Sequence, residues 1–86
     1  MRIIFHKQFK KKYEKLSTDE KRHFKERRDI FIQNPFHPLL KNHTLSGEFA
    51  KYRSLNITAD LRVIYEPIDN ETVLFTKIGT HSELYG

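Results

Sequence analysis

The sequence contains no cysteine, and it contains no long apolar run. The absence of cysteine excludes disulfide bonds, thiolate catalysis and sulfur-rich zinc sites, and it suits a reducing compartment. No apolar segment approaches the roughly 20 residues of a membrane-spanning helix, and the N-terminal residues lack the apolar region of a signal peptide. We therefore expect a soluble, cytoplasmic protein that does not bind a membrane.

The spacing motifs of common metal and hydrolase sites are also missing. The histidines form no HExxH or H-x₃-H pattern, and nearby lysines would repel a cation. No nucleophile elbow is present, which argues against a Ser-His-Asp hydrolase. We therefore expect neither a metal ion nor another cofactor.

Length and charge bound the remaining possibilities. A chain of 86 residues suits one domain, which at this size buries only about 60–65% of the surface of its unfolded chain. Without repeats or linkers, residues 1–86 are expected to form that single domain. The formal net charge of +5 indicates a polyanionic partner, either nucleic acid or an acidic protein segment.

The N-terminal residues predict a short strand followed by a helix. Residues 2–5 are typical of a strand. From His6 onward, Phe9, Tyr13 and Leu16 recur on one face of a helix. Lysines cover the rest of its surface, as on an ordinary solvated face.

A second helix should follow directly. Ser17 and Glu20 have the spacing of a capping box, in which the hydroxyl and the carboxylate satisfy backbone donors. This helix should end at Asn34, because Pro35 disfavours helical geometry in the preceding residue. The two helices predict a helical hairpin.

The C-terminal half predicts strands. Residues 35–46 are expected to form a loop with one helical turn, and strands are expected at residues 49–57, 61–66 and 72–78. A turn at Asp69-Asn70 should join the last two strands. The fold class is therefore α+β, with an N-terminal strand, a helical hairpin and then three antiparallel strands, the helices packing on one face of the sheet.

Strand alternation predicts which side chains share the open face of this sheet. Asp60 and Arg62 should lie on the face opposite Leu61, Val63 and Tyr65. With the turn centred on Asp69-Asn70, Arg62 would pair with Lys77 and Asp60 with Gly79. The predicted open face gathers one carboxylate, several cations and two ring side chains: Asp60, Arg62, Lys77, His81 and Tyr85, with Lys51 and Arg53 on the neighbouring strand.

The residues after the last predicted strand carry an imidazole and a phenol. Small domains usually end in a frayed polar tail, whereas His81 and Tyr85 are suited to proton transfer and to stacking on a base. The alternative is that Leu84 and Tyr85 simply pack the end of the chain.

Metal-free cleavage of RNA would use such a set of residues. The 2′-hydroxyl of RNA attacks the adjacent phosphate, with a base near that hydroxyl, an acid at the 5′-oxygen and cations at the phosphate. Asp60, His43, His81 and Arg62 can fill these roles. The alternative is a surface ion pair of Asp60 with Arg62 or Lys77, worth about 0–1 kcal/mol.

At four stretches the chain resembles the RelE/ParE superfamily of bacterial toxins, and within it the YafQ-like mRNA interferases. These stretches are residues 42–47, 52–53, 60–65 and 78–86. The resemblance implies a RelE-like sheet and cleavage of mRNA in the ribosomal A site. It also implies that the protein is monomeric when free and forms a hetero-oligomer with a cognate antitoxin.

The resemblance also implies roles for individual residues. His43 matches the loop histidine of the YafQ-like branch, Asp60 its strand carboxylate and His81 its C-terminal histidine. Tyr85 stands at an aromatic position, and Arg62 stands where RelE has a strand arginine. We expect His81 to be the general acid and either Asp60 or His43 the base, with Arg62 stabilising the phosphate charge and Tyr85 stacking on a nucleotide.

The chain departs from the branch at two positions. Asn56 replaces a strand histidine, and Ser54 replaces a nearby acidic residue. Asparagine can hold a phosphate or a base but cannot shuttle protons, so a catalytically weakened, RNA- or antitoxin-binding protein is one alternative. A ParE-like gyrase inhibitor is another. The residues predicted to bind substrate or ribosome are Lys10, Lys11, Lys12, Lys51, Arg53, Asn56 and Lys77. No chemical role is expected for His6, His23 or His37.

Overall fold

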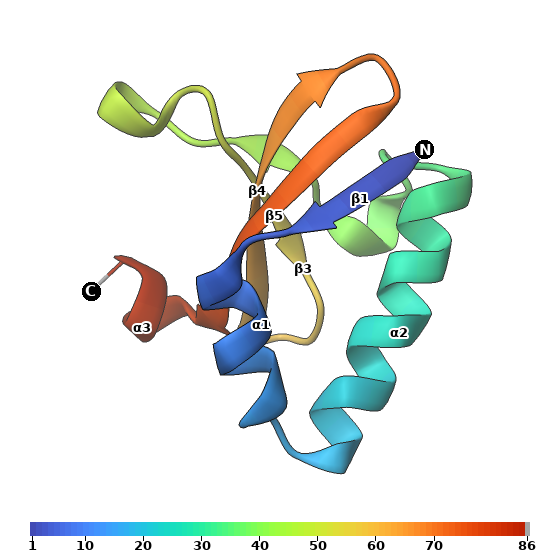
Figure 1. Ribbon diagram of the computed structural model, residues 1–86, viewed down its shortest axis with the longest axis vertical. Coiled ribbons are helices and arrows are strands. Elements are labelled where there is room, and N and C mark those ends of the chain that lie inside the picture. The colour runs from blue at the N-terminus through green and yellow to red at the C-terminus, as the bar shows by residue number, and fades with distance from the viewer. Residues whose placement is uncertain (86) are drawn as a thin grey trace.

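The computed structural model describes residues 1–85, which form a five-stranded sheet with α1 and α2 packed on one face (Figure 1). The strands are β1 Arg2–Phe5, β2 His43–Thr44, β3 Arg53–Asn56, β4 Leu61–Asp69 and β5 Thr72–Thr80. The helices are α1 Lys7–Glu14, α2 Thr18–Gln33 and α3 His81–Tyr85, and single 3-10 turns occur at η1 Pro38–Leu40 and η2 Gly47–Phe49. Gly86, which closes the C-terminal motif of the sequence, lies outside the described residues.

The strand order of the sheet is β1-β5-β4-β3-β2. β1 pairs with β5 in parallel, and the other neighbouring strands are antiparallel. The predicted α+β class and the helical hairpin are therefore confirmed. The two-residue β2 was not expected, because a strand of this length has no measurable period.

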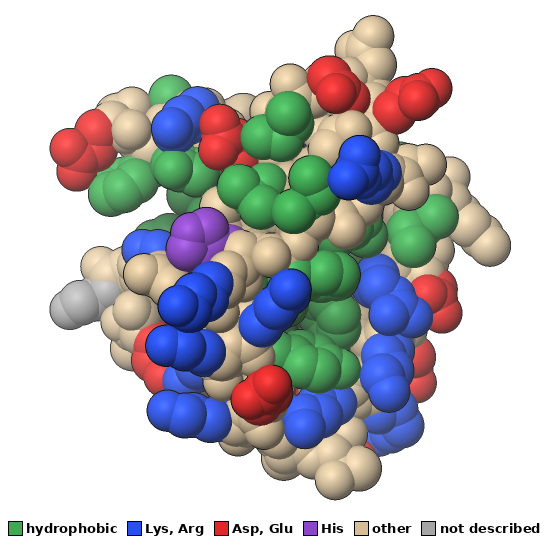
Figure 2. Space-filling view, in the orientation of Figure 1, with side chains coloured by type: hydrophobic (Ala, Val, Ile, Leu, Met, Phe, Trp, Pro, Cys, Tyr) green, Lys and Arg blue, Asp and Glu red, His purple; other side chains and the backbone are tan. Residues whose placement is uncertain are grey.

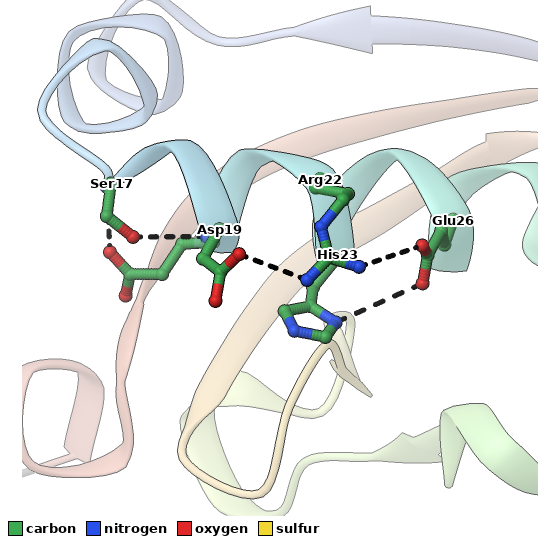
Figure 3. Close-up of polar contacts among 6 residues, drawn as sticks. Ser17, Asp19, Arg22, His23 and Glu26 are labelled. Carbon is green, nitrogen blue, oxygen red and sulfur yellow. Dashed lines mark hydrogen bonds and ion pairs between the residues drawn. The ribbon is translucent and has the colours of Figure 1, made fainter.

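Local capping signals determine where the helices begin. The His6 imidazole accepts a hydrogen bond from the backbone N–H of Gln8 and starts α1. The predicted capping box is present: Ser17 Oγ accepts from the Glu20 N–H at 3.1 Å, and the Glu20 carboxylate accepts from the Ser17 N–H at 2.9 Å (Figure 3). Along the exposed side of α2, Arg22 bridges Asp19 and Glu26.

An aromatic cluster joins the helical hairpin to the sheet. Phe75 of β5 lies 5.7–6.2 Å, between ring centroids, from Phe9, Phe24, Phe31 and Tyr65. All of these side chains are buried. Aromatic pairs in such tilted arrangements stabilise by about 0.5–1.5 kcal/mol beyond the burial of their surface. The cluster therefore fixes which face of β4 and β5 is covered by α1 and α2.

The predicted strand at residues 49–57 begins too early. Gly47 has a positive φ of 64°, and residues 47–49 form the η2 turn. The N–H of Tyr52 then donates to the carbonyl of Phe49 instead of to a neighbouring strand. The strand starts only at Arg53, because the preceding backbone groups are hydrogen-bonded within the turn.

The predicted register between the last two strands is also wrong, by two residues. Arg62 pairs with Gly79, and Ile64 pairs with Lys77. The side chain of Asp69 accepts a hydrogen bond from the N–H of Glu71, so the turn is centred one residue later than expected. A shift by two residues preserves the alternation of faces, so Arg62 and Lys77 still lie on the open face.

Candidate active site

A hollow on the open face of the sheet brings together side chains from both halves of the chain. It is lined by Lys41, His43, Leu45, Ser54, Asn56, Arg62, His81 and Tyr85. The predicted residues His43, Asn56, Arg62, His81 and Tyr85 therefore meet in one place. The sequence did not predict that Lys41, Leu45 and Ser54 also line the hollow. They are placed there by strand pairing and by the geometry of the loop, which no local sequence pattern indicates. Among residues 1–85, the lining contains cations and imidazoles and no carboxylate side chain.

The position of His43 follows from its pairing with Ser54 across β2 and β3. Its Nδ1 lies 2.8 Å from the carbonyl oxygen of Lys41. A carbonyl can only accept, so Nδ1 carries the hydrogen of the neutral ring and Nε2 carries the lone pair. Lys41 adopts a left-handed conformation, with φ 47°, that turns its carbonyl toward the ring. In its neutral form, the imidazole of His43 is thus oriented to accept a proton at Nε2.

Arg62 is anchored at one end of the hollow. It pairs with Asn56 on one side and with Gly79 on the other. Its Nη1 donates to the carbonyl of Thr58 at 3.1 Å. The hydroxyl of Thr58 in turn accepts from the N–H of Leu61 at 3.0 Å. The turn between β3 and β4 therefore holds the guanidinium in place and leaves its remaining donors available.

His81 and Tyr85 reach the hollow from α3. Their rings lie 4.8 Å apart, between centroids, and the Tyr85 hydroxyl donates to Ser54 Oγ at 3.2 Å. The backbone N–H of His81 donates to the carbonyl of Asp60 at 3.2 Å. His81 is exposed, so its imidazole is accessible to a ligand.

The structure does not bring the Asp60 carboxylate into this hollow. Asp60 lies in the turn before β4 rather than in the strand, and it is exposed. Within residues 1–85, its hydrogen bonds are made by its backbone: the carbonyl accepts from the His81 N–H, and the Asp60 N–H donates to Thr58 Oγ1. The expectation that Asp60 and Arg62 share a strand face is therefore corrected, because the strand begins one residue after Asp60.

Arg53 lies on the opposite face from the one predicted. It pairs with Tyr65, which is buried in the core. Its Nε donates to Asn42 Oδ1 at 2.7 Å, and its guanidinium lies 5.2 Å from the centre of the Phe36 ring. Asn42 also donates to the Tyr65 hydroxyl and to the Pro35 carbonyl, both at 2.9 Å. Arg53 thus ties the loop that carries His43 to the sheet.

The predicted lysines fall into different surroundings. Lys77 borders a second hollow on the open face, which shares Leu45 and Tyr85 with the first. Lys51 lies just before β3, with its Nζ 4.0 Å from a Glu66 carboxylate oxygen. Lys12 forms an ion pair with Glu83 of α3.

A basic surface covers the helical side. Figure 2 shows Lys and Arg side chains over α1 and α2 on both sides of an apolar strip. A hollow on this side of the molecule is lined by Phe5, Phe9, Tyr13 and Phe24, together with Lys10. Lys11 is exposed on the same helix. This surface is separate from the hollow that contains His43 and His81.

The other histidines make local contacts. The imidazole of His6 accepts from the backbone of Gln8, and that of His37 accepts from the N–H of Leu39. His23 lies 4.0 Å from the Glu26 carboxylate on α2 (Figure 3). In the described part of the chain, no three His, Cys, Asp or Glu side chains are grouped so that they could hold a metal ion. No helix in residues 1–85 is long and apolar enough to cross a membrane.

The fold is shared with a class of small α+β bacterial toxins of known structure. The chain is similar to a YoeB/ParE toxin from Agrobacterium tumefaciens, with a TM-score of 0.79 at 21% identity over 94% of this chain and 99% of that one. Within this class, residues 1–86 match the family described as "Bacterial toxin of type II toxin-antitoxin system, YafQ". The protein belongs to the YafQ toxin family.

Two solved structures from this family are similar over the full length of both chains. The crystal structure of YafQ from E. coli strain BL21(DE3) gives a TM-score of 0.78 at 26% identity, with 100% of each chain covered. A chain of the E. coli DinJ-YafQ complex gives 0.73 at 23% identity, again with 100% of each chain covered. No curated protein sequence gives a significant match.

Proposed function

We propose that this type II toxin is a ribosome-dependent, metal-independent endoribonuclease that cleaves mRNA in the A site and so inhibits translation. The observation that carries the proposal is the meeting of His43, Arg62 and His81 in one hollow on the open face. These groups supply a base, a cation and an acid for attack by a 2′-hydroxyl. On this proposal the protein acts in the cytoplasm, where its ribosome and mRNA partners are found.

His43 is the better of the two candidates for the base. Its imidazole lines the hollow, and its Nδ1 contact with the Lys41 carbonyl leaves Nε2 as the acceptor. The 2′-hydroxyl gives its proton to this nitrogen as its oxygen bonds to the adjacent phosphorus. The bond from phosphorus to the 5′-oxygen breaks, and His81 supplies the proton that the departing oxygen takes up. The product is a 2′,3′-cyclic phosphate and a free 5′-hydroxyl.

The other side chains of the hollow stabilise and orient the substrate. Arg62 and Lys41 face the phosphate, where negative charge accumulates in the transition state. The exposed Tyr85 ring stacks on a nucleotide. Asn56 is adjacent to Arg62 across the strand pair and donates to a phosphate or base without exchanging protons. Asn56 therefore assists binding, and the two imidazoles carry the proton transfers.

A cognate antitoxin is the second partner that we propose. The E. coli relative is described as a DinJ-YafQ toxin–antitoxin complex. No carboxylate side chain of residues 1–85 lines the hollow, which favours an acidic or amphipathic segment that covers Arg62 and His81. The free toxin would be a monomer that forms a hetero-oligomer with its antitoxin. Lys10 and Lys11, on the separate basic surface of α1, would contact the ribosome.

Primer extension on mRNA from a reconstituted translation reaction tests the nuclease proposal. We expect cuts that are in frame with codons and that appear only when ribosomes are present. The cuts should need no divalent cations beyond those that the ribosome itself needs. The rival function, inhibition of gyrase in the manner of ParE, predicts intact mRNA and accumulation of cleaved DNA. Intact mRNA in the presence of folded wild-type protein would refute the proposal.

A further inference from the structure

The helix that presents His81 and Tyr85 is too short to be stable by itself. α3 contains five residues, and isolated helices below about 12–15 residues are marginal in water. Its orientation must therefore come from contacts with the rest of the protein. Tyr85 is held by Ser54 at one end, as described above. The other end is held by Glu83.

Glu83 closes a capping box at the start of α3. One oxygen of its carboxylate accepts from the backbone N–H of Thr80 at 2.8 Å, and the Thr80 hydroxyl accepts from the N–H of Glu83 at 3.2 Å. This arrangement satisfies two backbone donors of the helix start. Gly79 leaves room for it, because a Cβ at this position would lie 3.2 Å from the same carboxylate oxygen.

The second oxygen of Glu83 accepts from the Lys12 ammonium of α1. Lys12 and Glu83 are far apart in sequence, and Figure 1 shows α1 and α3 side by side. The hydrogen bond from Lys12, followed by that from the Thr80 backbone, lowers the pKa of Glu83 to about 2. The carboxylate is therefore charged at neutral pH, and both of its oxygens are used.

This ion pair has little influence on the stability of the whole fold. The side chains of Lys12 and Glu83 are 38% and 46% exposed. Exposed ion pairs contribute little to global stability. Their contact instead joins a well-anchored helix to a weakly packed one. The aromatic core holds α1 through the buried Phe9, whereas α3 has no buried residue.

We propose that Lys12 is a positioning residue that holds α3, through Glu83, in the orientation that directs His81 and Tyr85 into the hollow. This inference rests on the proposed nuclease function and deepens it. It reassigns Lys12 from the group of ribosome-binding lysines to the active site. Lys12 touches neither substrate nor reacting atoms in this role, and it acts only through the carboxylate of Glu83.

Steady-state cleavage by five purified variants separates positioning from direct binding. Lys12→Met should lower kcat about 10–100-fold, the range expected for a displaced catalytic group, with KM changed by less than about twofold. Lys12→Arg should restore most of the rate, because it restores the ion pair. Glu83→Gln should lower kcat similarly, and the double variant Lys12→Met/Glu83→Gln should be no slower than the worse single variant. Lys15→Met, which removes the same charge just after α1, should cleave like wild type.

The outcomes that overturn the inference are distinct from failure of the nuclease proposal. A rise in KM with unchanged kcat in Lys12→Met would show that Lys12 binds the ribosome directly. Additive losses in the double variant would show that Lys12 and Glu83 act separately. If the wild type does not cleave RNA, the nuclease proposal fails. Hydrogen exchange of the α3 amides then still tests whether Lys12 holds α3 in place. Lys12→Met must then exchange faster than Lys15→Met, and equal exchange would refute the positioning role.

Discussion

Replacement of Asn42 by alanine tests whether the loop that carries His43 is held by the network on the helical face of the sheet. Asn42 accepts from Arg53 and donates to Tyr65 and Pro35. Burial raises the pKa of the Tyr65 phenol, so its hydroxyl remains protonated over the working range of pH. The variant would remove all of these hydrogen bonds and leave partly buried groups without their partners.

The expected loss follows from the number and kind of these bonds. A neutral hydrogen bond contributes about 0.5–1.5 kcal/mol net, and one to a charged group about 1.5–3 kcal/mol. Asn42 is only partly buried, so water replaces some of the lost contacts. We therefore expect Asn42→Ala to lower the free energy of unfolding by about 2 kcal/mol. In a domain of this size, that loss lowers Tm by roughly 10 °C.

Thermal unfolding followed by circular dichroism measures this effect, with Asn42→Asp as the matched control. Aspartate still accepts from Arg53, now with a charged partner, and can accept from the Tyr65 hydroxyl, but its second oxygen faces the Pro35 carbonyl, to which Asn42 donates at 2.9 Å. Asn42→Asp should therefore destabilise less than Asn42→Ala, because it keeps two of the three contacts. Cleavage should fall in Asn42→Ala, because the carbonyl of the preceding residue orients His43. If Asn42→Ala unfolds within about 2 °C of wild type, the usual range for unimportant surface positions, the network does not hold the loop.

Further predictions concern the site and its surroundings. His81→Ala should lower the cleavage rate by about 10²–10⁴ in primer extension, the usual loss for one acid–base group, with Tm unchanged, whereas His23→Ala should cleave like wild type. Lys10→Glu combined with Lys11→Glu should weaken ribosome binding in sedimentation assays and reduce its salt dependence, because phosphate contacts are lost. The lowered pKa of Glu83, about 2 against an ordinary 4.5, contributes stability that is present above pH 4.5 and lost as pH falls toward 2. Because the pair is exposed, this contribution is small, and an NMR titration tests the pair directly. The Glu83 carboxyl of the wild type should titrate well below 4.5, and Lys12→Met should move its pKa back toward that value; an unshifted Glu83 in the wild type would contradict the ion pair.

Local signals in the sequence were sufficient for the helices and for the fold class. The capping box at Ser17 and Glu20 and the spacing of Phe9 and Tyr13 each depend on residues within one or two turns. Such features are confirmed because neighbours in the sequence make the contacts. The same holds for the end of α2 before Pro35.

Contacts between distant residues could not be predicted in this way. The turn before Thr72 moved by one residue because of a single side-chain hydrogen bond, from the Glu71 N–H to Asp69. The face of Arg53 depends on its pairing with Tyr65, which periodicity within β3 alone does not determine. The pairing of Lys12 with Glu83 has no local signal at all, since it arises only when β1 and β5 bring α1 beside α3.

The two imidazoles of the hollow are held by separate devices on different sides of the sheet. The Lys41 carbonyl orients His43, and the network of Asn42 and Arg53 on the helical face secures that loop. α3 and the Glu83 carboxylate, tied to α1, orient His81. Ser54 touches both arrangements, since it pairs with His43 and accepts from Tyr85. The network of Asn42 and Arg53 and the pair of Lys12 and Glu83 share no residue, so loss of one should leave the contacts of the other intact. A variant in each of these two networks should therefore raise the free energy of activation for cleavage by the sum of the two single effects. Two variants within the same network should raise it by less than that sum.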